Sequence, residues 1–239
     1  MADRNATASP RLKARLAGLC YLLTIGVGAF DHLAVRGRLV DPGNAATTAH
    51  NILTSEPLYR VAFAVDLIPV YIVVTMLFYE LFKPVNASVS LLAAFSSLVG
   101  GAVGSAIALF QLAPLVVLGG SPYLGVFSAG QLQALSQMFL DLHQVGFDIS
   151  LAFFGFYCLL IGWLIVASGF IPRLVGACLA LGGLGYMAYS FASFAAPAIA
   201  AELSPYALTL GSLGEVVLTL WLLLVGLNAA KWRDLANRA

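Results

Sequence analysis

The sequence predicts an all-α, polytopic membrane protein: a bundle of six transmembrane helices, with a short surface helix between the first two. The 239 residues are 61% hydrophobic and only 10% charged, whereas a soluble domain has roughly 25% charged residues. Several separate apolar runs also reach the roughly 20 residues that a helix needs to cross a bilayer. We therefore expect a single six-helix transmembrane domain over residues 1–239.

The first span is expected at about residues 12–35, after a polar N-terminal segment. Residues 36–56 then form a loop with a turn at Asp41-Pro42-Gly43, which is typical turn chemistry. Within this loop Asn44 can cap a short helix over residues 45–54, whose apolar residues fall on one side. We place that helix on the membrane surface.

Turn and breaker residues separate the other five spans. Pro57 suits the first turn of a helix, a tight turn is expected at residues 83–86, and Gly169 is a natural helix stop. A loop that contains Pro197 and Pro205 is expected before the last span. The expected spans lie at about residues 57–82, 88–118, 137–168, 172–195 and 206–228.

Lysine and arginine residues in the loops predict the orientation. With the N-terminus inside, nine of them fall on the inner side and three, Arg36, Arg38 and Arg60, on the outer side. Because Lys and Arg accumulate on the cytoplasmic side, we expect a multi-pass protein of the cell (inner) membrane with both termini in the cytoplasm.

Small residues are expected to let the helices approach closely, since small side chains at four-residue spacing favour helix association in lipid. The third helix offers Ser97, Gly101 and Ser105 at this spacing. The fifth helix contains Gly176, Gly182, Gly183 and Gly185.

Polar residues gather at one depth in this topology. At about 1.5 Å per residue, Asp66, Asp148 and Glu215 lie on the order of 10 Å below the outer boundary. Four polar residues of the fourth helix share one face because they are spaced by four, three and four: Gln137, Asp141, Gln144 and Asp148. Glu80 instead lies at the inner end of the second helix, where we expect an ion pair with Lys83.

These faces suggest a polar, partly hydrated cavity that opens on the outer side. The candidate ligand- or proton-binding residues are Asp66, Asp148, Glu215, Asp141, Gln144 and His143. His143 points away from the face of Asp141 and Asp148, and its ordinary interpretation is an interfacial histidine satisfied by water or a carbonyl group. For the carboxylates the ordinary alternative is hydrogen bonding between helices. Such bonds average well below about 2 kcal/mol in membranes, and charged groups are a costly way to obtain them. We therefore favour a function for Asp66, Asp148 and Glu215.

The usual signatures of catalysis and metal binding are missing from the sequence. It has no Gly-x-Ser-x-Gly, His-Glu-x-x-His or Gly-x-Gly-Asp motif and no His-x-x-x-His pair, so we predict no catalytic residue, no metal site and no cofactor. Whether the protein is an enzyme stays open, and the missing motifs weigh against it. Cys20, Cys158 and Cys178 fall inside apolar runs and are expected to be packing residues. No basic tract indicates nucleic acid.

Several segments resemble one family of bacterial membrane proteins, DUF4386, a domain of unknown function. They are residues 15–30, 36–67, 79–86, 139–165, 168–186 and 213–228. The resemblance covers nearly the whole chain and implies an uncharacterised multi-pass protein of the cell membrane. It brings no established activity, so no catalytic residue is transferred from it.

Three functions are compatible with the sequence. The protein could bind or move a small ligand or a proton in the outer polar cavity. It could instead be a structural or regulatory protein that holds another membrane component or a second copy of itself, without ligand chemistry. An intramembrane enzyme is the third alternative. In each case the lipid bilayer surrounds the protein.

Overall fold

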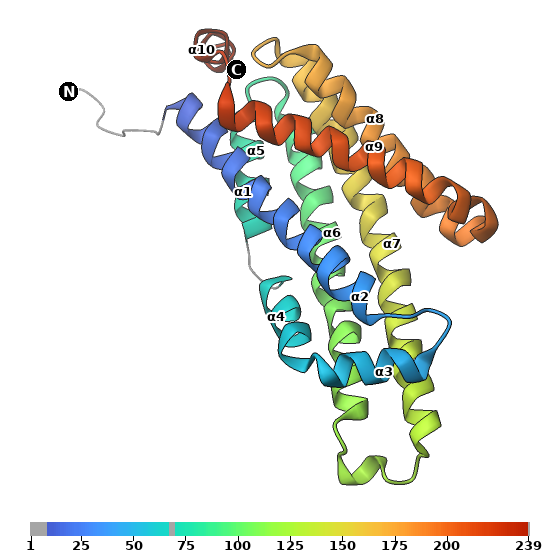
Figure 1. The fold of residues 1–239 in the computed structure, drawn as a ribbon. Helices are drawn as coiled ribbons and strands as arrows, with labels where there is room; N and C mark the ends of the chain where they lie inside the picture. Colours follow the sequence, from blue (N-terminus) through green and yellow to red (C-terminus); the bar gives the residue numbers. More distant parts are fainter. Residues whose placement is uncertain (1–8, 67–69, 239) are drawn as a thin grey trace. The chain divides into compact units, whose positions relative to one another are not determined.

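The computed structural model describes residues 9–66 and 70–238, and in this part of the chain every regular element is helical (Figure 1). The elements are α1 (Pro10–Phe30), the π-helix η1 (Asp31–Arg36), α2 (Gly37–Leu39), α3 (Ala45–Thr54), α4 (Glu56–Asp66), α5 (Val70–Phe82), α6 (Ala87–Leu118), the 3-10 helix η2 (Pro122–Leu124), α7 (Ala129–Ser168), α8 (Arg173–Ala195), α9 (Pro197–Leu224) and α10 (Ala229–Ala236).

Six helical stretches are long and apolar enough to cross a membrane. They are Pro10–Leu39, Glu56–Phe82, Ala87–Leu118, Ala129–Ser168, Arg173–Ala195 and Pro197–Leu224, the second of which runs over residues 67–69, outside the described part. The predicted all-α, multi-pass membrane protein is thereby confirmed. The short helix between the first two spans is also present as α3, where the Asn44 side chain accepts a hydrogen bond from Thr47 N at 3.0 Å.

Two expected boundaries were wrong. The first helix does not end near Val35 but continues through η1 and α2 to Leu39. The last helix begins at Pro197 and not near Tyr206, so Pro205 lies inside it. Proline fits the first turn of a helix because no N–H is needed there, and neighbouring helices can compensate for a proline further along in a membrane helix.

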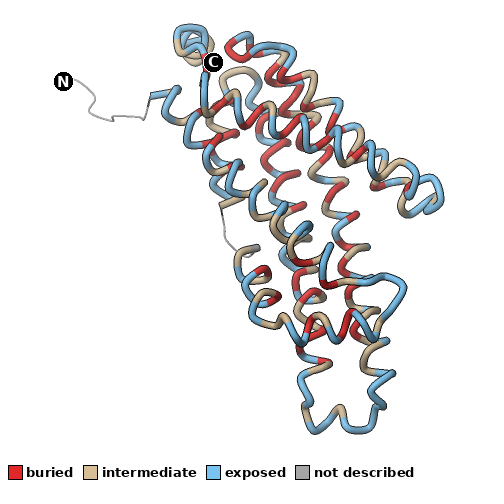
Figure 2. The backbone as a smooth tube through the Cα atoms, viewed as in Figure 1, coloured by how far each residue is buried: buried red, intermediate tan, exposed pale blue. Residues whose placement is uncertain are grey.

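Residue contacts divide the chain into two units. The first unit comprises residues 1–23, 70–100 and 151–239, and the second comprises residues 24–69 and 101–150. In Figure 2 buried residues recur along the helices of each unit.

In the first unit, glycines bring α7, α8 and α9 into backbone contact. A Cβ on Gly162 of α7 would lie 2.6 Å from the carbonyl oxygen of Gly176 on α8. A Cβ on Gly182 of α8 would lie 2.9 Å from Cα of Gly211 on α9. The prediction that the glycines of the fifth helix serve packing is therefore confirmed, because Gly176, Gly182, Gly183 and Gly185 all face a neighbouring helix.

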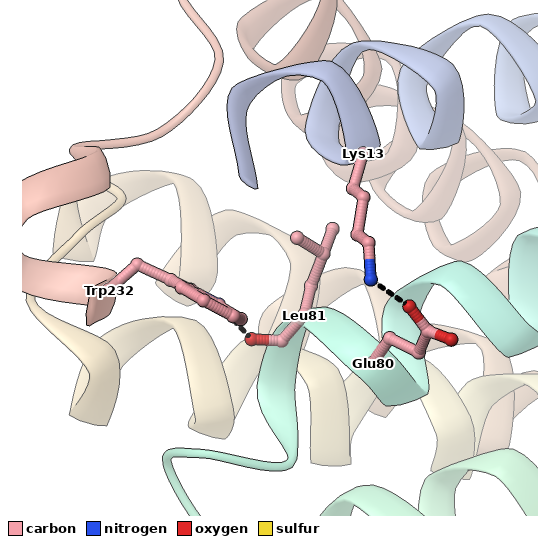
Figure 3. A network of polar contacts seen from close by, with 4 residues as sticks. All are labelled: Lys13, Glu80, Leu81 and Trp232. Atoms are coloured by element: carbon pink, nitrogen blue, oxygen red, sulfur yellow. Dashed lines mark hydrogen bonds and ion pairs between the residues drawn. The ribbon is translucent and has the colours of Figure 1, made fainter. Parts of the chain in front are cut away.

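The α5 end of the first unit is held by polar contacts from the two ends of the chain (Figure 3). The Lys13 ammonium pairs with the Glu80 carboxylate, and Trp232 Nε1 of α10 donates to the Leu81 carbonyl oxygen at 2.9 Å. The expected pair of Glu80 with Lys83 was wrong. Since α5 ends at Phe82, Lys83 leaves the helical spacing and lies over the Tyr79 ring at 5.9 Å instead.

The second unit has its own apolar core. Seven buried residues from η1, α2, α3, α4, α6 and α7 form it: Val35, Leu39, Ile52, Tyr59, Ala62, Leu115 and Leu140. The continuation of the first helix beyond Phe30 supplies Val35 and Leu39. Burying these two side chains is a physical reason for the helix to extend past its apolar span.

Replacing Gly162 by alanine is expected to lower the free energy of unfolding by about 1–3 kcal/mol, because the added methyl group forces α7 and α8 apart. Unfolding of the purified protein in detergent measures this. Gly28→Ala is the matched control, since a Cβ there meets nothing within 4 Å and alanine favours the helix. Equal stabilities for the two variants would contradict the close packing at Gly162.

Candidate functional site

Glu215 on α9 is a carboxylate buried inside the first unit, with 9% of its surface exposed. Its Oε1 accepts a hydrogen bond from the Tyr186 hydroxyl of α8 at 2.6 Å, and its Oε2 accepts one from the Tyr21 hydroxyl of α1 at 3.1 Å. One carboxylate thus links α9 to α8, its neighbour in the sequence, and to α1, which is far away in the sequence. Hydrogen bonds of this kind are what a buried charged group requires.

Two glycines place the carboxylate. A Cβ on Gly214 would lie 2.8 Å from the Cys178 carbonyl oxygen of α8, so α8 and α9 can approach here only because position 214 has no side chain. Gly211, one turn before Glu215, leaves room for the Tyr186 ring, which a Cβ at this position would overlap. The ring of Tyr186 is therefore wedged against α9, and its hydroxyl is directed at Glu215.

Two further tyrosines surround this carboxylate, and with Glu215, Tyr21 and Tyr186 we call the group the tyrosine–glutamate cluster. Tyr71 of α5 and Tyr157 of α7 interact electrostatically with Glu215. The buried Tyr157 hydroxyl has no hydrogen-bond partner among the described residues. Buried tyrosine hydroxyls usually have a hydrogen-bond partner, so the cluster has hydrogen-bonding capacity that its described bonds do not use.

Aromatic rings fill the space between these tyrosines. The Phe154 ring lies 6.1 Å from Tyr71, 5.9 Å from Tyr157 and 5.8 Å from Tyr186. The Phe78 ring lies 5.7 Å from Tyr21. Such distances are typical of packed aromatic pairs, so the polar atoms of the cluster are embedded in an apolar, close-packed surrounding.

The second unit contains a different polar group around Arg36, which we call the Arg36–Asp148 cluster. Arg36 Nη2 donates to Gln144 Oε1 at 3.3 Å, and Gln144 Nε2 donates to Asp148 Oδ1 at 2.9 Å. Gln144 therefore bridges the guanidinium and the carboxylate. Nearby, Gln111 Nε2 donates to Asp31 Oδ1 at 2.9 Å.

The π-helix η1 positions this cluster. It begins at Asp31 and ends at Arg36, and both side chains interact electrostatically with Tyr59. Residues five apart are hydrogen-bonded in a π-helix, which brings both to one side. An α-helix would separate them around its axis. Short π-helical segments are frequent at functional sites.

The candidates on α7 are not buried together as the prediction of one shared polar face suggested. Asp148 and His143 are both buried, each with 6% exposure, while Asp141 is exposed and accepts from Gln137 at 3.1 Å. His143, expected at the flank, interacts electrostatically with Arg36. Its Nδ1 has no hydrogen-bond partner among the described residues.

The structure therefore brings Gln144 and Asp148 together in the second unit and places Glu215 in the first. Asp66 ends α4, and its side chain lies outside the described part. The convergence of Asp66, Asp148 and Glu215 stays a prediction.

The residues that contact these candidates were not predicted from the sequence; they are Tyr21, Tyr186 and Arg36. The available signal for the tyrosines was a hydroxyl in the middle of an apolar run, which needs a partner. For Arg36 no comparable signal exists, because a basic residue just beyond an apolar span is ordinary.

Gln144→Ala is expected to lower the free energy of unfolding by about 1–3 kcal/mol, because it removes a donor from a buried carboxylate. Gln137→Ala is the matched control on the same helix, since it breaks an equivalent bond to the exposed Asp141. That change is expected to cost about 0.2–0.5 kcal/mol, the value of a surface pair. Unfolding in detergent compares the two, and similar losses would argue against the buried position of Asp148.

The chain was compared with known proteins. It matches no curated protein and no solved structure. Residues 16–226 match a family described as "Domain of unknown function (DUF4386)". This match covers both units apart from the two ends of the chain. It includes Tyr21, Tyr186 and Glu215 as well as the Arg36–Asp148 cluster. The chain therefore belongs to the DUF4386 family, as the resemblance in its sequence implied.

Proposed function

We propose that this integral membrane protein binds and moves protons, and that Glu215 is the group that carries them. The observation that supports this is the buried Glu215 carboxylate with a tyrosine hydroxyl on each oxygen. Ionisable residues inside membrane helices are expensive and commonly mark proton or ion pathways. The sequence prediction that Glu215 lies in the outer half of the membrane assumed a helix that starts near Tyr206; because α9 starts at Pro197, Glu215 lies past the middle of this helix.

The surroundings of Glu215 favour a proton over a larger ligand. The rings of Phe154, Phe78 and the tyrosines are packed around the carboxylate, and a proton needs no cavity. A tyrosine hydroxyl can both donate and accept. It can donate to the ionised carboxylate and accept from the protonated acid after rotating, so both states of Glu215 are hydrogen-bonded.

The Arg36–Asp148 cluster supports a second candidate function, the binding of a small polar ligand. Here Gln144 separates the guanidinium from the carboxylate, and His143 Nδ1 is buried without a described partner. A ligand with groups of both charges complements this arrangement. Asp148, Asp141 and Asp66 stay candidate proton-binding carboxylates predicted from the sequence.

The alternative is a structural or regulatory membrane protein without ligand chemistry. In that case the bonds of Tyr21 and Tyr186 to Glu215 only join α1, α8 and α9. The two functions differ in one respect: a structural role needs a hydrogen-bond acceptor at position 215, whereas proton transfer needs a titratable group there.

Glu215→Gln is expected to reduce proton flux in proteoliposomes at least about tenfold, because glutamine keeps an oxygen acceptor of similar size but cannot bind a proton at neutral pH. Flux is followed with a pH-sensitive dye inside vesicles after an external acid step. Glu56→Gln is the control. Glu56 is an exposed glutamate paired with Arg60 on α4, and its replacement should leave the flux unchanged.

Flux through folded Glu215→Gln equal to that of the wild type would contradict the proposal and favour the structural alternative. Asp148→Asn belongs in the same series. If its flux equals that of the wild type, Asp148 has no part in the proton route and Glu215 alone remains.

A further inference from the structure

Tyr186 connects the buried carboxylate to the surface of the first unit. Its hydroxyl donates to Glu215 Oε1 at 2.6 Å and lies 3.4 Å from Ser212 Oγ. Glu215 is buried, whereas Ser212 is exposed. A continuous line of hydrogen-bonding atoms therefore runs from an exposed hydroxyl through Tyr186 to the carboxylate.

The other oxygen of Glu215 faces the interior. Tyr21 is 1% exposed, its ring packs edge-on against Phe78, and the Phe78 ring lies 6.4 Å from Tyr157, which is itself buried. The two sides of the carboxylate are thus unequal. The side of Tyr186 leads to an exposed group, and the side of Tyr21 leads to the buried Cys158 thiol and to packed aromatic rings.

A stripe of polar residues on α9 continues the line from Ser212. Glu202, Thr209 and Ser212 are all exposed, and their spacings of seven and three place them on one face of the helix. The stripe runs from residue 202 to residue 212, which are ten helical steps or about 15 Å apart at 1.5 Å per residue. The three side chains thus form a polar line on the outer surface of α9.

We propose that Ser212 and Tyr186 conduct protons to and from Glu215, and that Tyr21 only holds the carboxylate in place. This inference rests on the proposed function and specifies its route. Besides Tyr186 on α8, the titratable groups that interact with Glu215 in the described part of the first unit are Tyr21 on α1, Tyr71 on α5, and Tyr157 and Cys158 on α7.

The transfer balances without another reactant. A proton from water binds Ser212 Oγ, the hydrogen of Ser212 passes to the Tyr186 oxygen, and the hydrogen of Tyr186 passes to Glu215 Oε1. Both hydroxyls keep one hydrogen, and the carboxylate becomes a carboxylic acid. Ser212 Oγ donates to the Leu208 carbonyl oxygen at 2.8 Å, so the serine hydroxyl must rotate before each transfer.

The experiment follows protonation of Glu215 by time-resolved infrared spectroscopy after a pH jump, with the full-length protein in liposomes. The carboxyl band of Glu215 is identified by its loss in Glu215→Gln. We expect Tyr186→Phe to slow the appearance of this band at least about tenfold, while its final intensity persists. Phenylalanine keeps the ring that packs against Phe154 and Gly211, so the fold should survive.

Three more variants distinguish a route through Ser212 and Tyr186 from a route through Tyr21. Ser212→Ala, at an exposed position, should also slow the band, and Ser212→Thr, which retains a hydroxyl, should restore the rate. Tyr21→Phe removes the other hydroxyl bonded to Glu215 and should slow the band less than Tyr186→Phe does, since general acid–base transfer through Tyr186 remains.

The outcomes distinguish failure of the proposed proton route from failure of the proposed function. If the Glu215 band titrates but Tyr186→Phe protonates as fast as the wild type, or Tyr21→Phe slows it equally, the route is wrong while the proposed function stands. If the wild-type protein shows no titrating Glu215 band, both proposals fail.

Discussion

The first unit depends on one constraint: a carboxylate buried among apolar helices must be hydrogen-bonded on both oxygens. Glu215 meets it through Tyr21 of α1 and Tyr186 of α8, which are far apart in the sequence. In lipid no hydrophobic effect drives helices together, so packing and interhelical hydrogen bonds select the arrangement. Fixing the position of Glu215 therefore also fixes how α1 and α8 face α9.

Glycines make these bonds geometrically feasible. Gly214 and Gly182 let the backbones of α8 and α9 meet, and Gly211 accepts the Tyr186 ring against its surface. Had α9 carried side chains at Gly211 and Gly214, the hydroxyl of Tyr186 could not reach Glu215. The glycines and the buried carboxylate therefore depend on each other, because close packing of the helices brings the tyrosine hydroxyls within hydrogen-bonding distance of Glu215.

The sequence predicted the six spans because hydropathy and length report directly on membrane burial. Boundaries failed where other forces decide them. The helix extends past Val35 because Leu39 packs in a local core, and α9 starts at Pro197 because proline suits a first turn. Candidate carboxylates such as Glu215 and Asp148 could be predicted from their cost in lipid. Their partners could not, because the rotation of each helix and the π-helix before Arg36 leave no periodic signal in the sequence.

Proton binding at Glu215 is the claim on which the functional account depends. The most direct measurement is the carboxyl carbon chemical shift of Glu215 in glutamate-labelled protein, recorded by solid-state NMR in lipid bilayers from acid to alkaline pH. The signal is assigned by its absence in Glu215→Gln. The account predicts that it moves between the positions of a carboxylic acid and a carboxylate. A shift that stays constant over the whole range in which the protein remains folded would contradict it.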